Sequence, residues 1–260
     1  MNSNLCTIIS PRDEICGPGM TGLLRRITTA LVLMTPLAGH AASFQVTPVR
    51  VSFERANETT VMQFFNTGDE EASVQVEALA WSQTGGEDVY SPTEDVVAVP
   101  PIFKLKAGEK RIIRVALLHA PDVSKELAYR LFFTELPDPR KTDSPATVRM
   151  LLRIGVPVFV APQRKSDAAF QWVSVTRDRN ENGDQLTIKL RNTSNFHVQV
   201  QQLQALERSG KVITEDGGTY LLPGSTRELV LNIPSQAAVE SLRIISDTAE
   251  ASEHALTAAN

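Results

Sequence analysis

The stretch VRMLLRIGVPVFVAP (148–162) decides how the fold is interpreted. In its first half the apolar residues Val148, Met150 and Leu152 share one face, because alternate side chains of a strand point to the same side. Its second half is almost wholly apolar and ends at Pro162. Alternation is typical of a half-buried strand, whereas a continuous apolar run is typical of a strand that is covered on both faces. The stretch therefore predicts one long strand that begins in an exposed place and ends deep in a domain.

The exposed beginning of such a strand needs an explanation. Large apolar side chains beside unpaired backbone groups promote aggregation unless a partner is meant to pair there. We therefore expect the rest of the chain to form a frame that presents this strand to another protein. The alternative is that Val148, Met150 and Leu152 face the protein's own core.

Length and composition are those of an ordinary globular protein. The chain has 260 residues, of which 42% are hydrophobic and 22% charged, so one to two domains with real hydrophobic cores are expected. The net charge of −4 argues against nucleic acid or an anionic membrane as a partner of the whole surface.

Residues 1–42 are interpreted as a signal region outside the fold. The stretch MTGLLRRITTALVLMTPLAGHAA (20–42) has two arginines, a short apolar core and small residues, the layout of a secretory signal peptide cleaved after about residue 41–42. Residues 1–19 are interpreted as an over-long start. The apolar core (27–37) is shorter than the roughly 20 residues that a membrane span needs. Both cysteines, Cys6 and Cys16, precede the cleavage site, so the exported chain relies on its cores rather than on disulfides.

From Ser43 onward, short segments rich in Val, Ile, Phe and Thr alternate with turn clusters, a pattern typical of β-sandwiches. The first set of predicted strands comprises 44–53, 59–66, 72–82, 96–100, 103–105, 110–117, 127–135 and 148–160. The second set comprises 170–177, 185–192, 198–205, 219–222, 226–233 and 241–246. We therefore predict an all-β protein of two immunoglobulin-like β-sandwich domains, 43–162 and 167–250, followed by a flexible tail, 251–260.

The sequence contains no pattern that calls for catalysis, a metal or another cofactor. His119 and His197 stand alone, without further ligands at zinc spacing. The motifs of serine hydrolases, phosphate-binding loops and zinc peptidases are missing. The acidic run DVYSPTED (88–95) is interpreted as a solvated loop tip rather than a calcium site. An enzyme is therefore the least favoured class.

Several stretches resemble the periplasmic pilus-assembly chaperones of the PapD-like family. They follow one another in the order of the family's motifs: VTPVRVSF (46–53), FFNTGDEEASVQVEALAW (64–81), VPPIFKLKAGEKRIIRV (99–115), YRLFFTELP (129–137) and RMLLRIGVPVFVAP (149–162). The resemblance covers nearly all of residues 43–250 and is densest in the first domain. The segment 138–147 is short and the last strand lacks the usual lysine, and in both features the sequence resembles an archaic or divergent branch of the family.

The resemblance implies two immunoglobulin-like domains in a boomerang arrangement with a cleft between them. The family binds a pilus or fimbrial subunit by donor-strand complementation, in which the chaperone lends its seventh strand to a subunit fold that lacks one. Val148, Met150 and Leu152 match the donor positions. The implied function is a periplasmic chaperone that needs no cofactor and delivers subunits to an outer-membrane usher. Whether the free protein hides its donor strand by self-association is left open by the sequence.

The resemblance also implies two sets of charged site residues. In the family an arginine of the first strand and a lysine of the seventh bind the subunit's C-terminal carboxylate. Arg50 matches the arginine, but the lysine position falls at Pro157, so Arg153 is the substitute on that strand. A further set, Arg114, Glu135 and Asp247, matches an interdomain salt-bridge network.

A second function class remains open. A secreted immunoglobulin-like adhesin or structural binding module would bind through its loop tips rather than through an edge strand. A pilus subunit would carry an alternating extension after the signal region, whereas this chain enters its first predicted strand almost at once. The chaperone is therefore the favoured interpretation.

Overall fold

The computed structural model describes residues 44–54, 58–118, 124–138, 150–180, 183–234, 237–247 and 252–256. The predicted signal region, His119 and Val148 lie outside the described residues. The part that is described contains β-strands and no helix, and hence no helix long and apolar enough to cross a membrane. The expectation of an all-β protein is confirmed.

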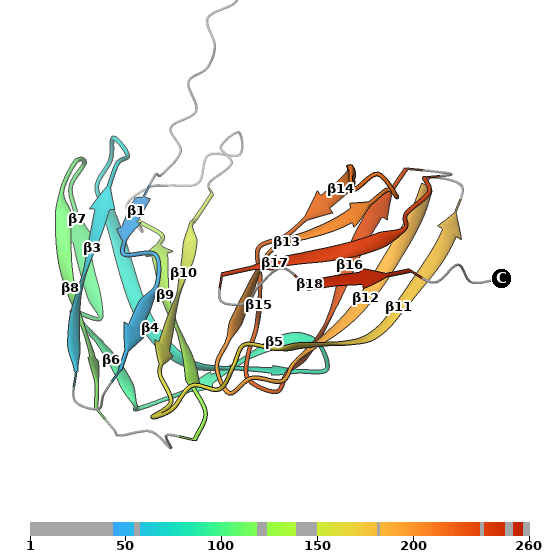
Figure 1. The fold of residues 1–260 in the computed structure, drawn as a ribbon. Helices are drawn as coiled ribbons and strands as arrows, with labels where there is room; N and C mark the ends of the chain where they lie inside the picture. Colours follow the sequence, from blue (N-terminus) through green and yellow to red (C-terminus); the bar gives the residue numbers. More distant parts are fainter. Residues whose placement is uncertain are drawn as a thin grey trace, which may run out of the picture. The chain divides into compact units, whose positions relative to one another are not determined.

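Ten strands form the first domain as a sandwich of two sheets (Figure 1). They are β1 (Phe44–Thr47), β2 (Val51–Phe53), β3 (Thr59–Asn66), β4 (Ala72–Thr84), β5 (Glu87–Pro92), β6 (Val96–Val99), β7 (Ile102–Leu105), β8 (Lys110–Leu117), β9 (Leu127–Leu136) and β10 (Arg153–Val160). One sheet has the order β1-β3-β8-β6, and the other the order β2-β10-β9-β4-β5 with β7 also paired to β4.

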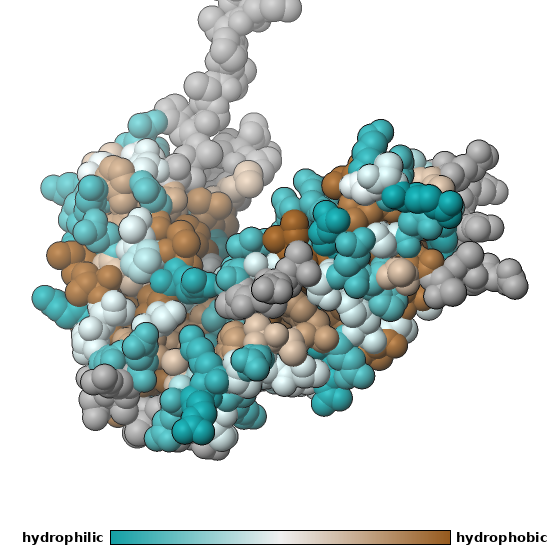
Figure 2. All heavy atoms as spheres, viewed as in Figure 1, coloured by the Kyte–Doolittle hydropathy of each residue, from teal (hydrophilic) through white to brown (hydrophobic). Residues whose placement is uncertain are grey.

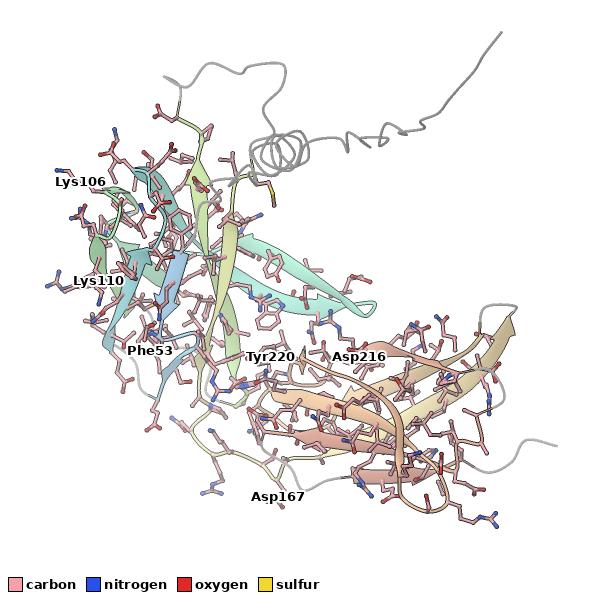
Figure 3. All side chains as sticks on the ribbon, turned by 90° about the horizontal axis from the view of Figure 1, so that it is seen from above. Phe53, Lys106, Lys110, Asp167, Asp216 and Tyr220 are labelled. Carbon is pink, nitrogen blue, oxygen red and sulfur yellow. The ribbon has the colours of Figure 1, made fainter. Side chains whose placement is uncertain are left out.

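The core of the first domain follows from strand alternation. Phe64, Leu131 and Val158 lie on inward positions of their strands and are almost fully buried. Side chains fill the space between the sheets: Phe53 of β2 is buried, whereas Lys106 and Lys110 point to solvent (Figure 3). The alternating pattern of the sequence thus becomes an apolar layer between two sheets.

The predicted first strand (44–53) is divided into two. β1 pairs antiparallel with β3 in one sheet, whereas β2 pairs parallel with β10 in the other. Residues Pro48–Arg50 form the bend between them. Because proline provides no backbone donor, Pro48 suits a point where the chain leaves one ladder. Arg50 therefore lies where the chain changes sheets.

Eight strands form the second domain, which also has two sheets with a core between them. They are β11 (Phe170–Asn180), β12 (Gly183–Asn192), β13 (Val198–Leu206), β14 (Val212–Asp216), β15 (Thr219–Leu221), β16 (Thr226–Ile233), β17 (Ser241–Ser246) and β18 (Ser252–Ala255). Two immunoglobulin-like sandwich domains are therefore confirmed.

Three local predictions differ from the structure. β10 begins at Arg153 rather than at residue 148. The acidic run after residue 87 is mostly strand β5, and Asp88 is partly buried rather than at a solvated tip. The expected tail contains β18, which pairs with β17 and is held by the ring of His254 stacked on Trp172. At β5 and β18, contacts distant in sequence, rather than local propensity, decide the structure.

Gly217 allows a close approach that no other residue permits. A Cβ atom at this position would overlap the backbone carbonyl oxygen of Gln201. We expect Gly217→Ala to destabilise the second domain by about 1–3 kcal/mol, because the backbone must shift to relieve the overlap. Denaturant unfolding followed by Trp172 fluorescence measures this loss. Gly155→Ala is the control, since its Cβ meets only the side chains of Phe132 and Arg130; equal stability of Gly217→Ala and the wild type would contradict the expectation.

Candidate functional site

The upstream half of β10 has an unpaired edge. β9 pairs with β10 along its whole length, but β2 pairs with Val158–Val160 alone. Among the described residues, no strand pairs with that second edge over Arg153–Pro157. Free backbone donors and acceptors along such an edge are a template for another strand.

The chain before β10 continues along β9 and exposes apolar side chains. Leu152 O accepts a hydrogen bond from Glu135 N (2.9 Å), and Leu152 N donates one to Glu135 Oε2 (3.2 Å). Met150 is 74% exposed, and Leu152 is half-buried outside the main core. Met150 therefore does not fill the core of its own domain, which leaves it available to a partner.

Two arginines flank Pro157, the position where the sequence lacks the expected lysine. Pro157 lies opposite Arg130 of β9, and Arg50 directly precedes Val51, which pairs with Val158. Residues opposite one another in neighbouring strands point to the same face. Extended by one residue, this register places Arg50, Pro157 and Arg130 in one row across the sheet, so that Arg130 is a second cation beside Pro157.

Arg153, the cation expected from the sequence, lies elsewhere on the same face. It is four residues from Pro157, which corresponds to about 13 Å along a strand. Its guanidinium lies over the ring of Phe132, with Cζ 3.9 Å from the ring centroid. The geometry thus favours Arg130 over Arg153 as the companion of Arg50. Arg130 could not be found from the strand that the resemblance specifies, because it belongs to the neighbouring strand.

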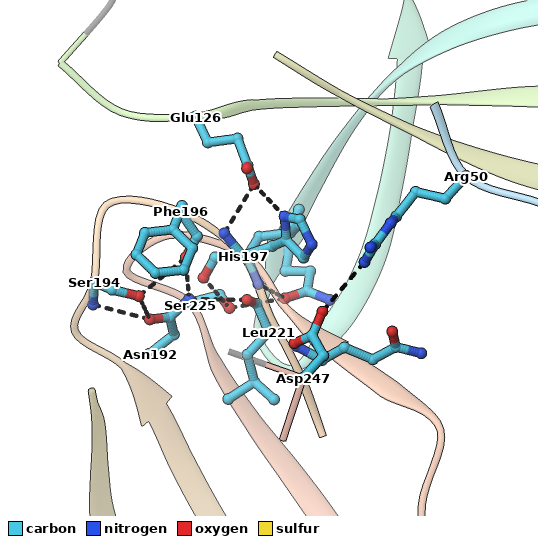
Figure 4. A network of polar contacts seen from close by, with 12 residues as sticks. Arg50, Glu126, Asn192, Ser194, Phe196, His197, Leu221, Ser225 and Asp247 are labelled. Atoms are coloured by element: carbon cyan, nitrogen blue, oxygen red, sulfur yellow. Dashed lines mark hydrogen bonds and ion pairs between the residues drawn. The ribbon is translucent and has the colours of Figure 1, made fainter. Parts of the chain in front are cut away.

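Asp247 of the second domain contacts Arg50 of the first (Figure 4). Arg50 Nη1 donates to Asp247 Oδ2 at 3.2 Å. Gln199 N donates to Asp247 Oδ1 (3.0 Å), and Asp247 N donates to Gln199 O (3.1 Å), so the carboxylate is held firmly on its own domain. The Arg50 side chain is 44% exposed, and in the described contacts Asp247 engages a single guanidinium nitrogen. Nitrogens of Arg50 thus stay available to a second carboxylate.

The structure does not bring Arg114, Glu135 and Asp247 together as the predicted network requires. Within the described ranges, no hydrogen bond or ion pair joins any two of them. Arg114 lies on the solvent side of β8, between Val61 and Val99 in a cross-strand row. Val61 and Val99 are both exposed. Apolar residues at the surface of the first domain are shown in brown in Figure 2. Asp247 joins the domains through Arg50 instead.

A buried pair that the sequence did not reveal also joins the two domains. Glu126 Oε1 accepts a hydrogen bond from His197 N (2.8 Å) and lies 2.7 Å from His197 Nδ1. The imidazole stacks on Phe159 of β10, with ring centroids 3.6 Å apart. Because an unpaired polar group is costly to bury, Glu126 and His197 each require the other. Their 71-residue separation leaves no local signal in the sequence.

No metal centre is found in the part of the chain that the structure describes. Among the described residues, no three or more His, Cys, Asp and Glu side chains come together in a way that could hold a metal ion. The arrangement of two arginines beside an unpaired strand edge is suited to binding an extended chain that ends in a carboxylate.

Comparisons with known proteins agree with this geometry. Residues 43–165 match the family model of the pili and flagellar-assembly chaperone PapD N-terminal domain, and residues 168–255 match that of the pili assembly chaperone PapD C-terminal domain. A search of curated proteins finds no match.

Solved structures share the fold. A chain of the CsuC–CsuE chaperone–tip subunit complex from Acinetobacter baumannii is 24% identical, with 82% of this chain and 98% of that chain covered and a TM-score of 0.59. A chain of the SafA pilin–SafB chaperone complex of Salmonella enterica is 17% identical, with 84% and 99% covered and a TM-score of 0.57. The Pseudomonas aeruginosa CupB2 chaperone is 18% identical, with 82% and 100% covered and a TM-score of 0.51. From its two matched domains and its fold, this chain belongs to the PapD-like family of pilus-assembly chaperones.

Proposed function

We propose that this pilus-assembly chaperone binds its subunit by donor-strand complementation. The segment from Val148 to Leu152 and the unpaired edge of β10 add a strand to a subunit fold that lacks one. The observation that carries the proposal is the highly exposed Met150 next to a strand edge that no described strand covers. Backbone pairing supplies the affinity, and the alternate apolar side chains fill pockets of the subunit.

Arg50 and Arg130 bind the subunit's C-terminal carboxylate in this proposal. A guanidinium holds a carboxylate through charge-assisted hydrogen bonds. The row that contains both arginines crosses β10 at Pro157, downstream of the donor segment. The bound carboxylate is therefore a fixed end point that sets the register of the added strand. The register in turn decides which side chains enter the subunit.

The remaining residues expected from the sequence receive supporting roles. Glu135 holds the backbone of Leu152 next to β9, so that the donor segment stays extended. Asp247 keeps Arg50 at the junction of the two domains. Arg114 lies on the outward face of the other sheet and is assigned no part in binding the carboxylate.

We infer that the protein acts in the periplasm and passes its subunit to an outer-membrane usher. Residues 20–42 have the pattern of an export signal. No nucleotide-binding motif is present in the sequence, so the energy for assembly resides in the subunit. In the absence of a subunit, the free edge of β10 pairs with that of a second copy, because an open apolar edge favours association.

Arg50→Ala tests the anchor. We expect the variant to bind the subunit roughly 10- to 100-fold more weakly, since a hydrogen bond to a charged group is worth about 1.5–3 kcal/mol. Co-purification of the subunit from a periplasmic extract, followed by titration of the isolated pair, measures the effect. Arg208→Ala is the matched control, because it also removes an exposed ion pair, that with Glu240. If Arg50→Ala retains its partner at full affinity, the anchor is wrong and binding through loop tips becomes the better account.

A further inference from the structure

The hairpin of β4 and β5 is tied to the second domain by one fully bonded side chain. Gln83 Nε2 donates hydrogen bonds to Asp88 Oδ1 and to Tyr220 O, each at 2.9 Å. Gln83 Oε1 accepts one from Leu222 N (2.9 Å), and the Ser225 hydroxyl lies 2.7 Å from it. An amide group has two donors and two acceptor sites. Gln83 thus uses its whole hydrogen-bonding capacity at this junction.

Asp88 adds an ion pair at the same place. Arg227 Nη1 of β16 donates to Asp88 Oδ1 at 3.0 Å, and both side chains are mostly buried. Burial alone would raise the pKa of the Asp88 carboxyl. The hydrogen bond from Gln83 and the charge of Arg227 outweigh burial and lower that pKa below its usual value. The neighbours of Asp88 therefore stabilise the charged form of its carboxyl group.

From Asp88 the contacts lead to Arg130. The hydroxyl of Tyr90 lies 3.4 Å from Asp88 Oδ2 and accepts a hydrogen bond from Arg130 Nη1 at 2.9 Å. Arg130 also lies over the ring of Trp81, with Cζ 4.4 Å from the ring centroid. Trp81 packs edge-on against Tyr220 of the second domain. The guanidinium is therefore held by Tyr90, whose neighbour Asp88 is paired with Arg227 of the second domain, and by Trp81, which contacts the second domain directly.

We propose that Asp88 and Tyr90 are positioning residues, through which the second domain holds Arg130 in the orientation that binds a subunit's terminal carboxylate. The part that concerns the orientation of Arg130 rests on the contacts above. The part that concerns the carboxylate rests on the proposed function. Gln83 supports both residues by fixing the hairpin on the second domain.

The test compares Tyr90→Phe, Asp88→Asn and the wild type as full mature chains. Tyr90→Phe keeps the ring that packs on Phe132 and removes the hydroxyl that Arg130 contacts. Asp88→Asn keeps the size of the side chain and removes its charge. Gln75→Ala is the control, because Gln75 is an exposed residue of the same strand as Gln83.

The first measurement is the NMR order parameter of the Arg130 guanidinium. We expect it to fall from about 0.85, a value typical of rigid groups, to below about 0.6 in both variants but not in the control. The thermal unfolding temperature is recorded in parallel, because a merely stabilising role would change that temperature and leave Arg130 ordered. An Arg130 side chain that stays rigid in Tyr90→Phe and Asp88→Asn overturns the inference.

The second measurement uses an eight-residue peptide of alternating threonine and valine, with a free C-terminal carboxylate or as its amide. We expect the wild type to prefer the free acid about tenfold, and the two variants to lose most of that preference, since a charged hydrogen bond is worth about 1.5–3 kcal/mol. A preference that is present in the wild type and unchanged in the variants overturns the positioning role alone. No preference in the wild type overturns the carboxylate site of the proposed function and the part of this inference that concerns the carboxylate, whereas the orientation of Arg130 is decided by the order parameter.

Discussion

Met150→Glu is expected to abolish binding of the subunit while leaving the chaperone folded. Met150 is 74% exposed in the free protein, so a glutamate there meets water and costs little stability. In the proposed complex, the same side chain would enter an apolar pocket of the subunit. The variant loses roughly 1.5–3 kcal/mol from burial of the methionine and further energy from the transfer of a carboxylate out of water. We therefore expect affinity to fall by more than about 100-fold.

The neighbouring residue, Leu151, provides a control whose apolar side chain points in another direction than that of Met150. Leu151 is 46% exposed and, by strand alternation, points to the opposite side from Met150. Leu151→Glu should leave binding within about threefold of the wild type if the subunit receives alternate side chains. Titration of the purified subunit with each variant measures both effects. Equal losses in the two variants would show that the segment binds without a defined strand register.

Phe64→Ala is expected to give the largest loss of stability, about 3–5 kcal/mol. Phe64 is 1% exposed and lies at the centre of the first core. Its ring contacts those of Phe44 and Phe133 at centroid distances of 5.1 Å each, and that of Phe103 at 5.7 Å. Truncation removes these contacts and leaves a cavity that surrounding strands, fixed by their hydrogen bonds, fill incompletely.

The measurement follows the first domain separately from the second. Trp172 lies in the second domain, whereas Trp81 lies on β4 of the first domain and also contacts Tyr220 of the second. With single-tryptophan variants, the transition of the first domain is therefore the one that Trp81 shows and Trp172 does not. Phe65→Ala is the control on the same strand: Phe65 is half-buried on the opposite face, with Lys110 Nζ 5.3 Å from its ring centroid. A loss for Phe64→Ala no greater than that for Phe65→Ala would contradict the role of Phe64 in the core.

The sequence predicted those features that depend on alternation. The inward residues of β3 and β8 follow from period-two patterns, those of β10 lie in a continuous apolar run, and most strand positions were correct. Alternation states which residues share a face but not which strand lies alongside. For this reason the segment 44–53 was predicted as one strand, although it divides between two sheets.

The candidate site was predictable where it lies on one strand and not where it joins several. Arg50 and Met150 were identified from stretches that resemble known chaperone strands. Arg130 enters the site because β9 lies beside β10, and Asp247 meets Arg50 across 197 residues of chain. Gln83 lies on β4, and the groups that it binds on the second domain come from β15 and from the turn after it. No local pattern marks such partners, because tertiary packing alone brings them together.

The continuity of β10 with the segment before it restricts which changes of length the protein can accept. Val156, Val158 and Val160 point into the core, and Met150 lies an even number of residues before them. A single-residue insertion or deletion between Met150 and Val156 would turn the proposed donor side chains to the other face, whereas the valines would keep their places. Tolerated length changes in this interval are therefore expected in steps of two residues.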